Sequence, residues 1–170
     1  MLRIAFASTD RRHVDLHFGA AVRLVIYDVA PGYADLVGVG EFVPAEQVGT
    51  EGRTGLEGTV ADKVAVKLAF LDGCAAVYAA SIGASSIRRL MSAQIQPVIV
   101  DTGHDIEDLL NEVSLALVHG GLAWVDRAKA RTRSPDRFDA MAEEGWQPND
   151  DDPPLPRERR QLITSIDELA

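Results

Sequence analysis

Residues 74–91 read Cys-Ala-Ala-Val-Tyr-Ala-Ala-Ser-Ile-Gly-Ala-Ser-Ser-Ile-Arg-Arg-Leu-Met. The first seven residues form a short, continuous apolar run, which is typical of a buried strand. The stretch from Ser81 to Ser86 offers a tight turn with candidate helix caps, and Ile87, Leu90 and Met91 then share one helical face. A buried strand that turns directly into a helix is a β-α unit, so this stretch predicts an α/β fold.

The segments on either side extend this pattern. Apolar residues between Val60 and Leu71 recur every three to four positions, as in a helix, and Asp72-Gly73 ends the run. Pro97-Val98-Ile99-Val100 predicts a strand, and residues 105–118 predict a helix with acids in its first turn. Because a helix connects them, the strands at 74–80 and 97–100 are expected to be a parallel pair with a right-handed crossover.

The chain before residue 60 predicts strands. Residues 2–8 are apolar and β-prone, and residues 22–29 and 34–43 are strand-like runs separated by the turn signal Pro31-Gly32. These two runs are expected to form an antiparallel hairpin. Residues 44–58 contain four glycines and show no apolar period, so a mobile loop is expected there.

The predicted order β-β-β-α-β-α-β-α is that of a ribonuclease-H-like mixed five-stranded sheet with flanking helices. This order predicts one domain over residues 1–130, followed by an acidic, partly disordered, largely irregular tail over residues 131–170. The tail contains a possible short helix around 135–144. Residues 161–169 are amphipathic, which fits either a frayed terminus or a segment that folds on a partner.

Composition excludes several classes of protein. The formal net charge is −9, with 16 acidic and 11 basic residues before residue 131 and 10 and 6 after it, so nucleic-acid binding is not expected. Cys74 is the only cysteine, which rules out an intrachain disulfide and fits a reducing cytoplasm. The first residues lack the pattern of a signal peptide, and nothing approaches a membrane span, so no membrane association is expected.

The loop after the first strand has an unusual number of charged and metal-binding side chains. It carries Asp10, Arg11, Arg12, His13, Asp15 and His17. Imidazole is a competent ligand for iron, and a pair of arginines can neutralise an anionic ligand. The ordinary alternative is that His17 packs at the strand edge, Phe18 anchors the loop in the core and Gly19 supplies a positive φ, while His13 is a solvated surface residue.

The turn from Ser81 to Ser86 is a second candidate site. It lies at the carboxyl end of a predicted parallel strand and opens a helix, whose free N–H groups can hold an anion close to Ser81 and Gly83. Ordinary helix capping by a serine oxygen explains the same residues. Arg88 and Arg89, one turn later, favour an anion only modestly.

Other chemistries receive little support. Cys74 precedes a buried strand, where cysteine usually acts as a small hydrophobe. A two-metal hydrolase needs converging carboxylates, but Asp10, Asp28 and Asp101 are scattered and have local reasons to be acidic. No phosphate-binding or nucleophile motif is present, so the residues by themselves indicate no reaction.

Several stretches read together resemble a known family. They are Ile4–Ser8, Val14–Gly19 with its His-Phe-Gly sequence, Asp62-Lys63, Gly73-Cys74, Ser81-Ile82-Gly83 and Ile95–Val98. Their order and spacing over residues 2–118 resemble the NifX/NafY-like dinitrogenase iron–molybdenum cofactor biosynthesis family. Trp124 and its basic neighbours also resemble the end of many such chains. No further domain precedes the first strand, so the chain is most similar to the small stand-alone members.

The resemblance implies a ribonuclease-H-like fold and a non-catalytic carrier. Such a carrier binds the iron–molybdenum cofactor or its iron–sulfur precursor transiently and passes it between cofactor-assembly proteins, a cluster synthase and a scaffold, in the cytoplasm. The family's cluster-binding histidine falls on His17, with His13, Arg11 and Arg12 secondary. The tail beyond Arg131 does not match the family. Two alternatives stay open, a regulatory or interaction module without a cluster and a ribonuclease-H-type hydrolase.

Overall fold

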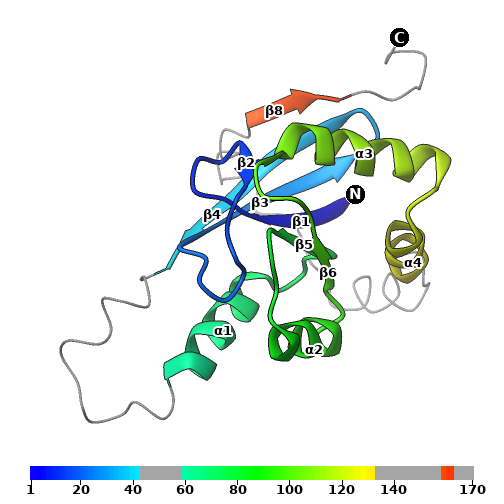
Figure 1. The fold of residues 1–170 in the computed structure, drawn as a ribbon. Coiled ribbons are helices and arrows are strands. Elements are labelled where there is room, and N and C mark those ends of the chain that lie inside the picture. Colours follow the sequence, from blue (N-terminus) through cyan, green and yellow to red (C-terminus); the bar gives the residue numbers. More distant parts are fainter. Residues whose placement is uncertain (43–58, 133–157, 163–170) are drawn as a thin grey trace, which may run out of the picture.

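The centre of the protein is a six-stranded mixed sheet (Figure 1). The computed structural model describes residues 1–42, 59–132 and 158–162. The strands are β1 (Leu2–Ala7), β3 (Arg23–Ala30), β4 (Tyr33–Glu41), β5 (Ala76–Ala79), β6 (Gln96–Ile99) and β8 (Glu158–Gln161), in the spatial order β6-β5-β1-β3-β4-β8. The five strands expected from the sequence are all present and neighbour one another as a ribonuclease-H-like sheet requires. The expected loop at 44–58 and helix at 135–144 lie outside the described residues.

Strand directions create one edge where several strands end together. The hairpin of β3 and β4 is antiparallel, with Ala30 opposite Tyr33, and Gly32 in its turn has a φ of 88°. Strand β1 is antiparallel to β3 but parallel to β5, and β5 is parallel to β6. The carboxyl ends of β1, β5 and β6 therefore meet at one edge, which we call the carboxyl edge.

Four helices cover the two faces of the sheet (Figure 1). They are α1 (Thr59–Phe70), α2 (Ala84–Ser92), α3 (Ile106–His119) and α4 (Ala123–Thr132). Alternate residues of β1 point to opposite faces. Phe6 belongs to the cluster packed under α3 and α4, whereas Ala5 and Ala7 belong to the cluster under α1 and α2. No helix within the described ranges is long and apolar enough to cross a membrane.

Helix α4 is not predicted by the sequence pattern, which breaks at Gly120-Gly121. Both glycines have positive φ values, 76° and 107°, and turn the chain so that α4 returns to the core. Trp124 is 9% exposed, and its ring meets Tyr78 edge to face with centroids 6.3 Å apart. The pattern misses this helix because only Trp124, Val125 and Ala128 are buried, too few to mark a period.

Strand β8 also departs from the expected pattern, because it lies within the tail. It pairs antiparallel with β4, placing Gln161 opposite Tyr33. The N–H of Leu162 then donates to the carbonyl of Gly32 at 2.6 Å, and the Leu162 side chain is buried. The sequence Glu-Arg-Arg-Gln has no apolar alternation, so local patterns could not reveal this strand.

Candidate functional site at the carboxyl edge

Two loops are tied together at the carboxyl edge. The loop after β1 contains β2 (His13–Val14), which pairs antiparallel with β7 (His104–Asp105) in the loop after β6. The N–H of Gly103 donates to the Val14 carbonyl and the N–H of Ile106 to the Arg12 carbonyl, both at 2.8 Å. These two-residue strands form only because the loops meet, which is why no local pattern predicts them.

His17 lies beside the turn that follows β5. The two segments form a parallel bridge between His17 and Ser81, in which the Phe18 N–H donates to the Ser81 carbonyl at 2.9 Å. The side chains also meet, with His17 Nδ1 2.5 Å from Ser81 Oγ. The imidazole is exposed, so this contact orients its ring and leaves Nε2 as the outer nitrogen.

The residues after His17 differ in part from expectation. Phe18 is fully buried and anchors the loop, as the sequence predicts. Gly19 does not have a positive φ, so that reason for glycine is wrong. A methyl group at Gly19 would instead lie 3.4 Å from His17 Nε2. Glycine therefore keeps the approach to the outer nitrogen open.

Lys67 of α1 is a site residue that sequence reasoning missed. Its Nζ donates to the carbonyls of Phe18 at 3.0 Å and Gly19 at 2.7 Å, and lies 5.6 Å from the centre of the Phe42 ring. The side chain is almost completely buried, and this burial, with a smaller effect of Lys63, lowers the pKa of Lys67 to about 8. The sequence did contain a signal for its burial, because Lys67 lies on the same helix face as the apolar residues Val64 and Leu71.

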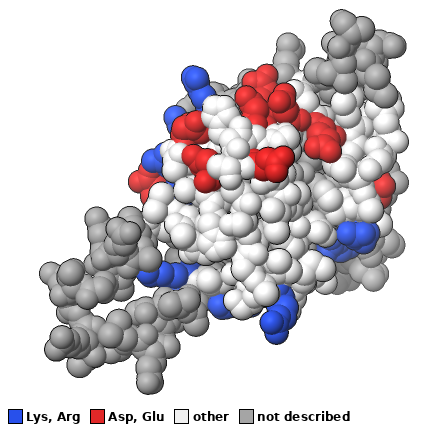
Figure 2. Space-filling model, in the orientation of Figure 1, with Lys and Arg blue, Asp and Glu red and all other residues white. Residues whose placement is uncertain are grey.

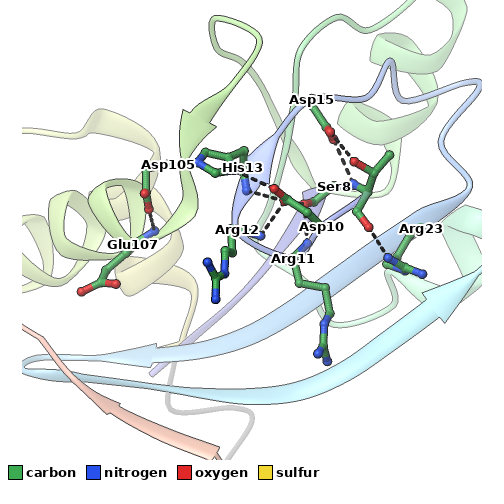
Figure 3. A network of polar contacts seen from close by, with 10 residues as sticks. Ser8, Asp10, Arg11, Arg12, His13, Asp15, Arg23, Asp105 and Glu107 are labelled. Atoms are coloured by element: carbon green, nitrogen blue, oxygen red, sulfur yellow. Dashed lines mark hydrogen bonds and ion pairs between the residues drawn. The ribbon is translucent and has the colours of Figure 1, made fainter.

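Asp10 organises the first half of the loop (Figure 3). Its Oδ1 accepts the N–H groups of Arg12 and His13 at 2.8 Å each, and its Oδ2 lies 2.7 Å from His13 Nδ1. The His13 side chain, followed by these N–H groups, lowers the pKa of Asp10 well below its usual range. The bond to Asp10, with nearby Asp105 and Asp15, raises the pKa of His13.

The structure groups the predicted site residues into two sets. His17 and Ser81 are in contact, and Gly83 follows Ser81 closely as the N-cap of α2. His13 is held by Asp10, while Arg11 and Arg12 are exposed and point away from Asp15 in Figure 3. Gly83 has an extended backbone with φ −67° and ψ 152°, and no side chain caps the helix. Serine capping therefore does not explain the Ser81 hydroxyl, which bonds to His17.

Charge is distributed unevenly over the face seen in Figure 2. Acidic side chains gather where β2 and the start of α3 lie in Figure 1, whereas basic ones lie over α2 and α4 and also beside the acids near β2. The acids of the carboxyl edge and of α3 include Asp10, Asp15, Asp101, Asp105, Glu107 and Asp108. Arg11 and Arg12 are therefore the cations of the loop that counter this negative charge near β2.

The remaining candidates lie elsewhere. Cys74 is buried just before β5, at the opposite edge of the sheet from His17, and burial raises its pKa to about 12. It borders a hollow of about 650 Å³ whose Arg3 is already paired with Asp28, at 2.8 and 3.0 Å. Asp28 is thus bonded to Arg3, far from Asp10.

Within the described ranges, no three His, Cys, Asp or Glu side chains group closely enough to hold a metal ion.

The site is thus an exposed imidazole, bonded to Ser81, in the strand-end loops of an α/β sheet. Open α/β sheets commonly bind ligands at this edge. The chain belongs to the dinitrogenase iron–molybdenum cofactor family, whose model matches residues 1–115. It is 45% identical over 148 residues to protein NifX of Azotobacter vinelandii, covering 86% of this chain and 87% of that protein. It is 32% identical to protein NifX of Klebsiella pneumoniae, covering 89% and 88%.

Proposed function

We propose that this protein is a non-catalytic carrier for the nitrogenase iron–molybdenum cofactor or its iron–sulfur precursor. It receives the cluster from one cofactor-assembly protein and delivers it to another, the partners being a cluster synthase and a scaffold of nitrogenase maturation in the cytoplasm. Family membership and similarity to NifX proteins over most of both chains support a role in making this cofactor.

The observation that carries the proposal is the pairing of His17 with Ser81. A histidine that ligates a metal through one nitrogen is usually oriented by a hydrogen bond at the other. His17 Nδ1 has that second bond, to Ser81 Oγ at 2.5 Å, and Gly19 leaves Nε2 accessible. Iron accepts imidazole nitrogen, so His17 Nε2 is the proposed ligand to an iron of the cluster.

A small number of protein ligands to the cluster suits a protein that must release its cargo. Dissociation governs how long a complex lasts, and imidazole nitrogens that an acceptor can displace permit quick transfer. The free N–H groups at the start of α2, next to Ser81 and Gly83, add neutral donors for the anionic cluster. Arg11 and Arg12 contribute longer-range positive charge that offsets the acidic surroundings, and His13 adds to it when protonated.

The test is an anaerobic titration of the apo-protein with isolated iron–molybdenum cofactor and, separately, with its iron–sulfur precursor, followed by gel filtration and iron analysis. Wild type should retain iron, and both His17→Ala and Gly19→Ala should lower retention about tenfold or more. Cys74→Ala is the matched control, because Cys74 lies at the opposite edge, and it should retain iron like wild type. If wild type retains no cofactor or precursor, the protein is instead an interaction module of this fold.

A further inference from the structure

A hollow of about 420 Å³ opens next to the His17 loop. It is lined by Ala80, Ile99, Val100, Asp101, Thr102 and His104. Its volume lies within the range of small-ligand sites, about 300–1,000 Å³. The Ala80 N–H donates to the Leu16 carbonyl at 2.9 Å, so one wall of the hollow is bonded to the residue directly before His17.

The register between β5 and β6 places the residues that follow the two strands at the same height along the strand direction. Ala79 of β5 is the partner of Ile99 of β6, so Ser81 and Asp101 lie two residues beyond a paired position on neighbouring strands. Neighbouring strands are roughly 5 Å apart. His17, bonded to Ser81, therefore stands at the β5 side of this edge, and His104 stands at the β6 side.

His104 is held in place by its backbone, while its ring is exposed. It is the partner of Val14 in the β2–β7 pair, and its N–H donates to the Asp101 carbonyl at 3.1 Å. Among the described contacts, the imidazole makes no hydrogen bond or ion pair. This contrasts with His13, whose Nδ1 is occupied by Asp10. His119 is the last residue of α3 and lies at the far end of that helix from the carboxyl edge.

We infer that His104 supplies a second imidazole to the cargo, so that the cluster lies at this hollow and is bound by His104 from the hollow and by His17 from the adjoining loop. The inference rests on the proposed carrier function. A single metal ion needs several ligands converging on one centre, which the described residues do not offer. A cluster of several irons can instead be bound at two separate metal atoms, one by each imidazole. The Thr102 hydroxyl can donate to an anionic group of the cargo, and Asp101 offers a carboxylate oxygen as a further ligand.

The inference is tested by comparing four proteins loaded with isolated iron–molybdenum cofactor: wild type, His17→Ala, His104→Asn and His119→Asn. Pulsed electron paramagnetic resonance counts the histidine nitrogens coupled to the cluster, and gel filtration measures the iron retained. Wild type and His119→Asn should show two coupled nitrogens. His17→Ala and His104→Asn should each show one, with affinity lowered about tenfold.

The outcomes separate the two proposals. A single coupled nitrogen in wild type, lost in His17→Ala and unchanged in His104→Asn, overturns the role of His104 and keeps the carrier function. Failure of wild type to retain the cofactor overturns both. Circular dichroism of His104→Asn checks the fold, which should be unchanged because the His104 side chain is exposed.

Discussion

His17 owes its position to residues from distant parts of the chain. Ser81 bonds to its ring from the end of β5, and Lys67 of α1 bonds to the two carbonyls that follow it. The Lys67 ammonium is buried, so its hydrogen bonds are not weakened by competing water. The side-chain bonds that position the imidazole and the carbonyls after it thus come from one hydroxyl and one ammonium group.

Replacing Lys67 should loosen the His17 loop. Lys67→Met keeps the approximate side-chain volume but removes hydrogen bonds that involve a charged donor, each worth about 1.5–3 kcal/mol. Since about 1.4 kcal/mol corresponds to a factor of ten, the loss of even one of the two bonds should make the Phe18 amide, bonded to Ser81, exchange at least roughly tenfold faster with deuterium. Hydrogen exchange followed by nuclear magnetic resonance measures this rate.

The control for this prediction is Lys63→Met, one turn earlier on the same helix and without a described bond to the loop. It should leave Phe18 exchange unchanged, and Lys67→Arg should preserve part of the protection. Equal exchange in wild type and Lys67→Met would show that the carbonyl contacts do not hold the loop.

Asp10 and His13 predict a pH dependence of the loop. The pKa of Asp10 is lower in the folded protein than in the unfolded chain. The Asp10 carboxylate therefore stabilises the fold above about pH 3.9, and this stabilisation is lost as the pH falls through the pKa of the folded state. The pKa of His13 is higher in the folded protein than in the unfolded chain. The protonated imidazole therefore stabilises the fold below about pH 6.5, and this stabilisation is lost as the pH rises through the pKa of the folded state. The pair is therefore fully formed between roughly pH 4 and 6.5.

Asp10→Asn should lower the pKa of His13 toward its ordinary value of about 6.5, because the carboxylate partner is removed. A nuclear magnetic resonance titration of the imidazole protons measures the shift. Asp126→Asn, on α4, serves as the control and should leave the titration of His13 unchanged. A His13 pKa that does not move in Asp10→Asn would disprove the pairing in solution.

At the scale of elements, two glycines of β4 differ in how closely α1 packs on them. A methyl group at Gly40 would lie 2.7 Å from Cζ of Phe70, whereas one at Gly38 would lie 3.8 Å from the same atom. Gly40→Ala should therefore displace the outer end of the Phe70 ring and lower the free energy of unfolding by about 1 kcal/mol. Gly38→Ala is the matched control and should change it by less than about 0.5 kcal/mol. Urea denaturation monitors both; equal stabilities would mean that α1 shifts freely on β4.

Elements defined by local patterns could be predicted, and those defined by partners could not. The apolar run at 74–80, the hairpin around Pro31-Gly32 and helix α3 have periods that the sequence shows directly. The pairs β2–β7 and β4–β8 depend on contacts between distant segments of polar sequence. The same limit applies to the candidate site. The resemblance to the family predicts a role for His17, but nothing local could show that Ser81, 64 residues away, bonds to its ring.

For the whole molecule, the sheet has two outer strands with different protection. The edge strand β6 contains Pro97, which lacks an N–H, and Gln96 Nε2 donates to the Pro97 carbonyl at 3.1 Å. On the other side, β4 is covered by β8. Strand β8 therefore replaces β4 as the outer strand and pairs with backbone groups that an exposed β4 would offer to another copy.

Deletion of residues 158–170 should expose the edge of β4. We expect the free energy of unfolding to fall by about 2 kcal/mol or more, because the buried Leu162 is lost, and self-association to increase. Deletion of residues 163–170 alone keeps β8 and Leu162 and is the matched control. Urea denaturation and light scattering after gel filtration provide the measurements. Identical behaviour of the two truncated chains would mean that β8 contributes nothing.

The bonds that hold the His17 loop also bear on the kinetics of the proposed cargo exchange. Asp10, the β2–β7 pair and Lys67 fix the loop before any cluster arrives, so binding requires little additional ordering. Loading is then limited by encounter and ligand substitution rather than by loop closure. Unloading does not require this loop to open, so it proceeds by direct competition for the iron. Transfer should therefore accelerate in proportion to the concentration of the acceptor protein.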